Sequence, residues 1–337
     1  MKNKKILLSQ DLSFGTEYLN EILQELKKRF EEVYTIEHEL GEFKKNFNYK
    51  FFREITKKFK EKNVLKRYFY KYEKIKIKEN LKKYSAIDYF FIIGNRDFSP
   101  YFFKILKELN PQIKIILFLW DKLEYSCWNA ERIKYIDFVF SYDREDARKN
   151  NFIFRPTFYI KECLKEIPEK KEYALYYVGA LRDKKRYKYI LTIKNHLDNL
   201  GLKSFLKLYV DKNNKKYLEN KKTRELFISN KISYLENLKN LKKSRAVLDI
   251  KYKNQKGLTL RVYEALAMDI KIITDNDDIK NYDFYNEKNI KIINNINEIE
   301  KIDINFFKEE PEIIPEDIKY KYSIDGFIDE IIRKVEE

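Results

Sequence analysis

The chain alternates short apolar runs with amphipathic segments of helical length over most of its length. Apolar runs of four to eight residues bounded by turn residues are typical of buried strands. The strands predicted in this way are Lys5–Ser9, Val33–Ile36, Ala86–Ile93, Ile113–Leu119, Phe138–Ser141, Ile153–Tyr159, Tyr173–Val178, Phe205–Val210, Ala246–Ile250, Lys271–Thr274 and Ile290–Ile293. Strands that alternate with helices predict an α/β fold with parallel sheets.

The length of 337 residues, about twice that of a typical domain, indicates two domains. A charged linker, Lys161–Lys171, contains Pro168 and marks the boundary. We therefore expect two Rossmann-like doubly wound domains, 1–162 and 170–322, that face each other across a cleft. An amphipathic C-terminal helix follows at 323–337, and its packing back on the first domain is left open.

One strand, loop, helix and strand unit, from Ser244 to Asp278, carries the clearest chemical signal. Its loop delivers Gly257 to the start of a predicted helix, where unpaired N–H groups and the helix dipole favour an anion. Glu264 lies further along this helix, with Arg261 one turn before it. This arrangement suits a nucleotide, with the diphosphate at the helix start and the ribose at the acid. The alternative is an exposed acid that pairs with Arg261.

The first strand leads into a loop that contains Gly15 and then into a helix. A single glycine falls short of the dinucleotide-binding fingerprint, so we do not expect a dinucleotide there. The loop still follows the carboxyl end of a strand, where open α/β sheets bind ligands. Elsewhere, Asp143 is predicted to cap a helix, with Asp146 at the capping-box position.

The net charge is +16, and most of it comes from one segment, Lys44–Lys83, which has sixteen basic and four acidic residues and many interleaved aromatic residues. Three interpretations are open: a solvated helical face over packed aromatics, a surface for anionic lipid or a lipid-phosphate acceptor, and a nucleic-acid surface. Nucleic acid is the least favoured, because no recognised nucleic-acid module is present.

Other classes of protein find little support. The two cysteines and two histidines are not arranged as a metal site or a disulfide framework, so we expect no metal. The apolar run Ile6–Leu8 is too short for a signal peptide, and no segment has the roughly 18 apolar residues that span a bilayer. We expect a cytoplasmic protein, free or peripheral on the inner face of the membrane.

Three passages resemble a known family. The first passage has the family's Gly-Leu-Thr-x-Arg and Glu-Ala-Leu pattern and reads NQKGLTLRVYEALAMDIKIITDN (Asn254–Asn276). The second is similar to the segment that closes the family's first domain and reads FVFSYDREDARKNNFIFRPTFY (Phe138–Tyr159). The third is similar to the first strand and basic loop of the family's donor domain and reads YYVGALRDKKRY (Tyr176–Tyr187). The chain thus resembles the GT-B glycosyltransferases of bacterial lipopolysaccharide, capsule or exopolysaccharide synthesis.

The resemblance implies a function and a set of donor-binding residues. It implies that Glu264 binds the ribose of a nucleotide sugar and that Arg182, with Lys185 or Arg186, neutralises the diphosphate. It also implies that Gly257, Leu258 and Thr259 offer backbone N–H groups, with a UDP-sugar as co-substrate, no further cofactor and no metal. The acceptor would be lipid-linked or an oligosaccharide. Arg182 as an ordinary surface arginine remains the alternative.

One position departs from the family pattern. Retaining members often carry a glutamate eight residues before the one that matches Glu264, and this chain has Lys256 there. Our hypothesis is that Lys256 faces the diphosphate, and the stereochemistry of the transfer stays open.

The acceptor hydroxyl needs a base, which should lie at the strand ends of the first domain. The carboxylates that follow predicted strands there are Asp121, Asp97 and Asp11, with Asp121 favoured. A surface or capping role is the alternative for each.

Two further functions compete with glycosyl transfer. One is another enzyme on the same scaffold, such as a sugar-nucleotide epimerase or a phosphate-polymer transferase. The other is a basic module that binds nucleic acid or membrane and has no chemistry.

Overall fold

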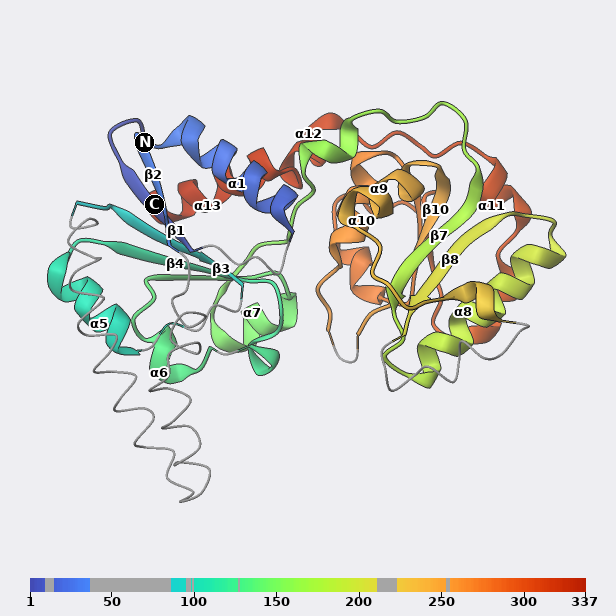
Figure 1. Cartoon of the computed structure of the whole chain (residues 1–337), viewed down its shortest axis with the longest axis horizontal. Coiled ribbons are helices and arrows are strands. Elements are labelled where there is room, and N and C mark those ends of the chain that lie inside the picture. Colours follow the sequence, from blue (N-terminus) through green and yellow to red (C-terminus); the bar gives the residue numbers. More distant parts are fainter. Residues whose placement is uncertain are drawn as a thin grey trace, which may run out of the picture. The chain divides into compact units, whose positions relative to one another are not determined.

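The computed structural model describes residues 1–9, 15–36, 86–94, 98, 100–126, 128–210, 223–252 and 255–337. These residues form two compact units, Met1–Arg155 and Pro156–Glu337. Each unit is built on a sheet of six parallel strands, as Figure 1 shows. The predicted pair of Rossmann-like domains is confirmed.

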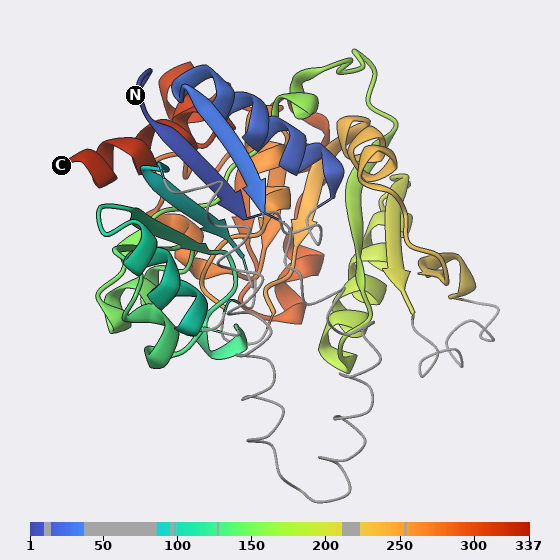
Figure 2. The same ribbon diagram turned by 60° about the vertical axis from the view of Figure 1, so that its left-hand side comes forward.

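The sheet of the first unit has the strand order β2-β1-β3-β4-β5-β6. One face packs on α5 through an apolar cluster, and α1 covers the opposite side of the sheet (Figures 1 and 2). The elements of this unit are β1 (Lys5–Ser9), α1 (Thr16–Arg29), β2 (Glu32–Ile36), β3 (Tyr89–Ile93), α5 (Pro100–Leu109), β4 (Lys114–Leu119), η3 (Leu123–Tyr125), α6 (Ala130–Ile133), β5 (Phe138–Ser141), α7 (Arg144–Asn150) and β6 (Ile153–Phe154).

The sheet of the second unit has the order β12-β11-β10-β7-β8-β9. Helix α8, η8 and α11 cover one face, and α9 and α10 contact the strands from the other face. The elements are η4 (Lys161–Leu164), β7 (Tyr173–Ala180), α8 (Lys184–Asn199), β8 (Ser204–Tyr209), η6 (Arg224–Leu226), β9 (Phe227–Ile228), α9 (Tyr234–Lys242), β10 (Ser244–Asp249), α10 (Leu260–Ala267), β11 (Lys271–Thr274), η7 (Asp277–Asn281), β12 (Ile290–Ile292), η8 (Ile296–Lys301), α11 (Ile304–Lys308), α12 (Glu316–Lys321) and α13 (Ile324–Glu336).

The strand predictions differ from the structure mainly at the ends of strands. The predicted strand Ile153–Tyr159 is the two-residue β6, because Pro156 follows and has no N–H group for a ladder hydrogen bond. Strand β9 was not predicted, because two residues are too few to show a period. The predicted linker Lys161–Lys171 contains η4, and the buried Lys242 side chain donates a hydrogen bond to the Glu162 carbonyl there.

The Asp143 cap predicted for α7 is confirmed, and α13 begins with a side-chain cap that was not predicted. The Asp143 carboxylate accepts the Asp146 N–H group at 3.0 Å at the start of α7. Ser323 accepts the Gly326 N–H group at 3.1 Å at the start of α13. The apolar face predicted for this last helix is buried, and its Phe327 ring packs 4.3 Å from that of Phe158.

Helix α13 packs closely on the end of α12. A methyl group at Gly326 would lie 2.1 Å from the Tyr320 carbonyl oxygen, so Gly326→Ala forces the backbone apart. We expect a loss of about 1–3 kcal/mol of stability, although alanine is otherwise favoured over glycine in helices. Thermal and urea unfolding measure the loss. Arg333→Ala, at an exposed position of the same helix, serves as the control and should change stability by less than about 0.5 kcal/mol. Equal effects of the two variants would contradict this packing argument.

Candidate functional site

The strand order of the second unit reverses between β7 and β10, its two central strands. Open parallel sheets bind ligands beyond the carboxyl ends of the strands at such a switch point. Strand β7 ends at Ala180 and β10 ends at Asp249. The loops that follow lead into α8 and α10. The predicted diphosphate ligands lie in these two loops and in the first turn of α8.

Asp249 is fully buried at the end of β10. Its carboxylate accepts hydrogen bonds from the hydroxyl groups of Thr259 (2.7 Å) and Thr274 (3.4 Å). The Arg261 guanidinium lies 3.9 Å away. Burial raises the pKa of Asp249, and the nearby Arg261 charge and the Thr259 hydroxyl partly oppose that rise.

Thr259 is the N-cap residue of α10, but its hydroxyl makes no capping hydrogen bond within the described residues. The hydroxyl is directed to Asp249 instead. The first N–H groups of a helix have no partner within the helix. Asp249 therefore leaves the start of α10 without its usual side-chain acceptor, which favours an external anion.

Arg261 joins α10 to the neighbouring strand. It donates a hydrogen bond to the Val178 carbonyl of β7, and its guanidinium lies 5.1 Å from the centre of the Tyr177 ring. Together with the proximity to Asp249, these contacts fix Arg261 as a support for the helix start.

The basic residues that follow β7 differ in their exposure to solvent. Arg186 is only 7% exposed and donates to the carbonyl groups of Ala180 and Ile250, each at 3.2 Å. It therefore ties the loops after β7 and β10 together. Arg182 and Lys185 are exposed, so their charges remain available to a ligand.

Both exposed cations are held in place by neighbours. The Arg182 guanidinium lies 4.8 Å from the centre of the Tyr252 ring. The Lys185 ammonium forms a 3.1 Å ion pair with Asp275, which also accepts the Lys251 N–H group at 2.7 Å. The loops after β7, β10 and β11 thus meet around these two cations.

Lys256 lies against the loop after β11. Its ammonium is 3.4 Å from the Asp277 carboxylate, and its carbonyl accepts a 2.9 Å hydrogen bond from Asn276. Partial burial raises the pKa of Asp277, but the charges of Lys256 and Lys251 outweigh that effect and lower it. The predicted contact of Lys256 with a diphosphate stays a prediction.

Gly257 and Leu258 are buried just before α10, and Glu264 is half-buried within that helix. The Glu264 charge adds to the effect of burial in raising the pKa of Cys163 and of Tyr176. Glu264 therefore lies on the side of α10 that is near η4 and β7.

In the first unit, Asp121 is half-buried just after β4. The loop that follows is fixed because Asp146 accepts the Leu123 N–H group at 2.8 Å. Burial raises the pKa of Asp146, and that hydrogen bond opposes the rise. Gly15 precedes α1 with φ of 91°, a left-handed conformation that favours glycine. Asp11, Asp97 and the segment Lys44–Lys83 lie outside the described residues.

Three residues that organise this region were not predicted from the sequence: Asp249, Tyr252 and Asp275. Asp249 closes an apolar run, and an acid at the carboxyl end of a buried strand is the signal that could have identified it. Asp275 directly follows the predicted strand Lys271–Thr274 and gives the same signal. Tyr252 gives no comparable signal, because its partner Arg182 is distant in the sequence.

Known structures with this fold support the assignment of the architecture. A UDP-GlcNAc 2-epimerase from Neisseria meningitidis bound to UDP-GlcNAc matches with a TM-score of 0.56 and 10% identity, over 98% of this chain and 99% of the other. A lipopolysaccharide outer core galactosyltransferase in its apo form matches with a TM-score of 0.56 and 15% identity, over 98% and 99%.

A third structure is an α,α-trehalose-phosphate synthase (UDP-forming) from Burkholderia xenovorans in complex with glucose-6-phosphate. It matches with a TM-score of 0.60 and 10% identity, over 99% of this chain and 100% of the other. No family model matches the sequence, and no curated protein matches it. At these identities the likeness establishes the fold, which is GT-B.

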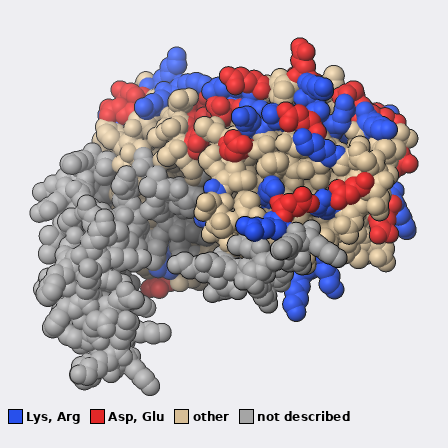
Figure 3. Space-filling model, turned by 45° about the vertical axis from the view of Figure 1, so that its right-hand side comes forward, with Lys and Arg blue, Asp and Glu red and all other residues tan. Residues whose placement is uncertain are grey.

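The described residues contain neither a metal-binding cluster nor a membrane-spanning helix. No group of three or more His, Cys, Asp or Glu side chains there is placed to hold a metal ion. No helix in the described part of the chain is long and apolar enough to cross a membrane. On the face seen in Figure 3, basic and acidic side chains are interspersed rather than gathered by sign.

The hydrogen bond from Thr259 to Asp249 can be tested directly. Thr259→Val removes the hydroxyl group from a buried carboxylate, so we expect a loss of about 1–3 kcal/mol in the free energy of unfolding. Thr259→Ser keeps the hydroxyl group and is the matched control, with a smaller loss.

The loss of unfolding free energy in Thr259→Val should depend on pH. Because the pKa of Asp249 is raised in the folded state, the stability that its neutral form contributes is present at low pH and disappears as the pH rises through that pKa. The charged form depends more on the Thr259 hydroxyl, so the loss in Thr259→Val should grow as the pH rises. Urea unfolding at several pH values measures it, and an equal loss in the serine variant would contradict the proposed bond.

Proposed function

We propose that this protein is a glycosyltransferase that uses a nucleotide sugar as donor. The observation that carries the proposal is the start of α10 at the switch point, where the Thr259 hydroxyl donates to Asp249 instead of capping the helix. The exposed cations Arg182 and Lys185 follow the neighbouring strand β7, in its loop and in the first turn of α8. A helix start with nearby cations suits a diphosphate.

The proposed roles follow from these contacts. Arg182 and Lys185 bind the diphosphate, the start of α10 donates backbone N–H groups, and Glu264 binds ribose hydroxyls. Arg186 and Arg261 position the loops, because their guanidinium groups are committed to backbone carbonyls. Cations and a helix start stabilise the charge on a departing nucleoside diphosphate without a metal. The proposed acceptor-side base is Asp121.

UDP is the proposed nucleotide, since an epimerase bound to UDP-GlcNAc and a UDP-forming synthase have similar folds. The proposed acceptor is a growing, lipid-linked bacterial surface glycan. Its support is the sequence resemblance, together with the galactosyltransferase of similar fold that acts on the lipopolysaccharide outer core. The same proposal includes that the enzyme acts at the inner face of the cytoplasmic membrane. The basic composition of Lys44–Lys83 supports this part of the proposal.

A second candidate is a sugar-nucleotide epimerase, because a UDP-GlcNAc 2-epimerase shares this fold. An epimerase converts its nucleotide sugar without an acceptor, whereas a transferase needs one for transfer. Incubation with UDP-GlcNAc alone, followed by NMR of the sugar protons, separates the two reactions. A new epimer in this mixture would replace the transferase proposal.

The donor site is tested with a panel of nucleotides and nucleotide sugars. We expect UDP or a UDP-sugar to raise the unfolding midpoint, and this shift should persist in the presence of EDTA. Arg182→Ala removes one charge-assisted contact and should weaken UDP binding by about tenfold or more. Calorimetry measures the affinity.

Lys188→Ala is the matched control for Arg182→Ala. It removes an exposed positive charge from α8 beyond its first turn, and it should leave the affinity nearly unchanged. Equal losses in both variants would indicate a diffuse electrostatic effect. The absence of any shift across the panel would favour a binding module that lacks the chemistry.

A further inference from the structure

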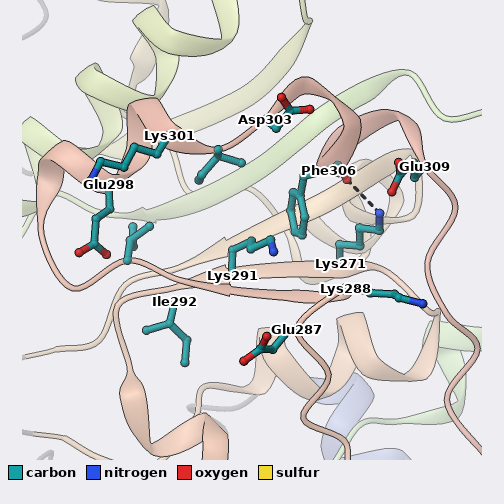
Figure 4. Close-up of a pocket in the computed structure, with 12 residues that line it drawn as sticks. Lys271, Glu287, Lys288, Lys291, Ile292, Glu298, Lys301, Asp303, Phe306 and Glu309 are labelled. Atoms are coloured by element: carbon teal, nitrogen blue, oxygen red, sulfur yellow. Dashed lines mark hydrogen bonds between the residues drawn. The ribbon is translucent and has the colours of Figure 1, made fainter.

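A cavity of about 610 Å³ lies in the second unit, at the β12 edge of the sheet. Its walls come from β11, β12, η8 and α11, and it shares no residue with the candidate donor site (Figure 4). Lysine and acidic side chains surround the ring of Phe306 in this cavity.

Lys271 is a buried cation in the wall of the cavity. It is 3% exposed, and its ammonium donates one hydrogen bond, at 3.1 Å, to the Phe306 carbonyl. Among the described residues it makes no further hydrogen bond and no ion pair. A buried charge without a partner is costly, so this ammonium group can gain from an anion in the cavity.

Lys291 brings a second positive charge to the same ring. It lies on β12 opposite Ile273 of β11, so its side chain is on the same face of the sheet as that of Lys271. The ammonium groups of Lys271 and Lys291 are 5.1 Å and 5.8 Å from the centre of the Phe306 ring. In Figure 4 the Lys291 side chain points toward the ring, and that of Lys271 ends at the Phe306 carbonyl. Neither makes an ion pair with the described residues.

The electrostatics of Lys271 agree with this arrangement. Burial lowers its pKa most, and the charges of Arg245 and Lys291 lower it further. Glu309 and Glu310 oppose the shift but do not cancel it. The two lysines therefore repel each other in a site that no described carboxylate neutralises by direct contact.

Three other charged side chains in the wall of the cavity, those of Glu298, Asp303 and Lys288, have partners of their own. Glu298 accepts N–H groups from Asn294 (2.8 Å) and Asn295 (2.9 Å). Asp303 accepts the Asn305 N–H group at 2.7 Å, and Lys288 is paired with Glu312. The remaining lining charges are three lysines and two glutamates: Lys271, Lys291, Lys301, Glu287 and Glu309. Hydrogen bonds do not remove the charges of Glu298 and Asp303, so the lining as a whole has four lysines and four acidic residues. The case for an anionic ligand therefore rests on Lys271 and Lys291, which pair with no described carboxylate.

We propose that this cavity binds a phosphate group, held between the ammonium groups of Lys271 and Lys291. Phosphate oxygens accept charge-assisted hydrogen bonds from lysine, and a dianion between the two lysines removes their repulsion. The volume leaves room for a larger molecule that carries the phosphate group. This site is separate from the proposed donor site and does not depend on the function proposed there.

The test is calorimetric titration of the full chain with inorganic phosphate. We expect saturable binding that weakens by about tenfold or more in Lys271→Met, because one charge-assisted hydrogen bond is lost. Lys291→Met should weaken it similarly, and it keeps the proposal testable if Lys271→Met fails to fold, because Lys291 is exposed. No saturable binding to the wild type, or unchanged affinity in both variants, would overturn the proposal.

Two controls separate this site from other effects. Lys288→Met removes a lining charge that is already paired with Glu312, so phosphate affinity should change by less than about twofold. Arg182→Ala alters only the proposed donor site and should leave phosphate affinity unchanged. If Arg182→Ala abolished phosphate binding while Lys271→Met did not, the phosphate would belong to the donor site and the proposal would be wrong.

A second titration identifies the source of the phosphate group. Glucose 6-phosphate that binds more tightly than inorganic phosphate, and loses affinity in Lys271→Met, assigns the site to a phosphorylated metabolite. Equal affinities assign it to free phosphate. Both results support the site, whereas binding of glucose 6-phosphate that is insensitive to Lys271→Met and Lys291→Met contradicts it.

Discussion

The carboxylate of Asp249 is enclosed at the end of β10, and the candidate donor site depends on how its charge is satisfied. Taking a carboxylate out of water is costly unless hydrogen bonds and a cation replace the water. Thr259, Thr274 and Arg261 provide that replacement. Because Thr259 and Arg261 belong to the start of α10, the same contacts fix that helix start at the switch point of the sheet.

The basic residues Arg182, Lys185, Arg186 and Arg261 near the switch point divide into two groups with different physical roles. Arg186 and Arg261 donate to backbone carbonyls of β7 and of the loop after β10, which holds these segments together. The exposed guanidinium of Arg182 lies over the ring of Tyr252, and the exposed ammonium of Lys185 pairs with Asp275. The committed cations make the site rigid, and the exposed ones give it a positive surface.

The cavity at the β12 edge differs in how its charges are balanced. At the donor site, the lysines Lys185 and Lys256 each have a carboxylate nearby, at 3.1 Å and 3.4 Å. At the cavity, Lys271 and Lys291 share one aromatic ring, and neither pairs with a described carboxylate. This contrast within one domain is the physical ground for assigning an anion to the cavity.

The sequence by itself determined the fold class, because buried strands and helices each have a characteristic spacing of apolar residues. This spacing is visible within short stretches of the sequence. It predicted the strand β11, the Asp143 cap and the buried face of α13. It could not rank Arg182 against Arg186, since both belong to one basic run. Because β7 and β10 are neighbours in the sheet, the carbonyls of Ala180 and Ile250, 70 residues apart in the sequence, both accept hydrogen bonds from Arg186. Arg186 is therefore buried, whereas Arg182 is exposed. Asp249 and Lys271 likewise belonged to runs that predicted strands, and only the tertiary structure showed which groups surround their charges.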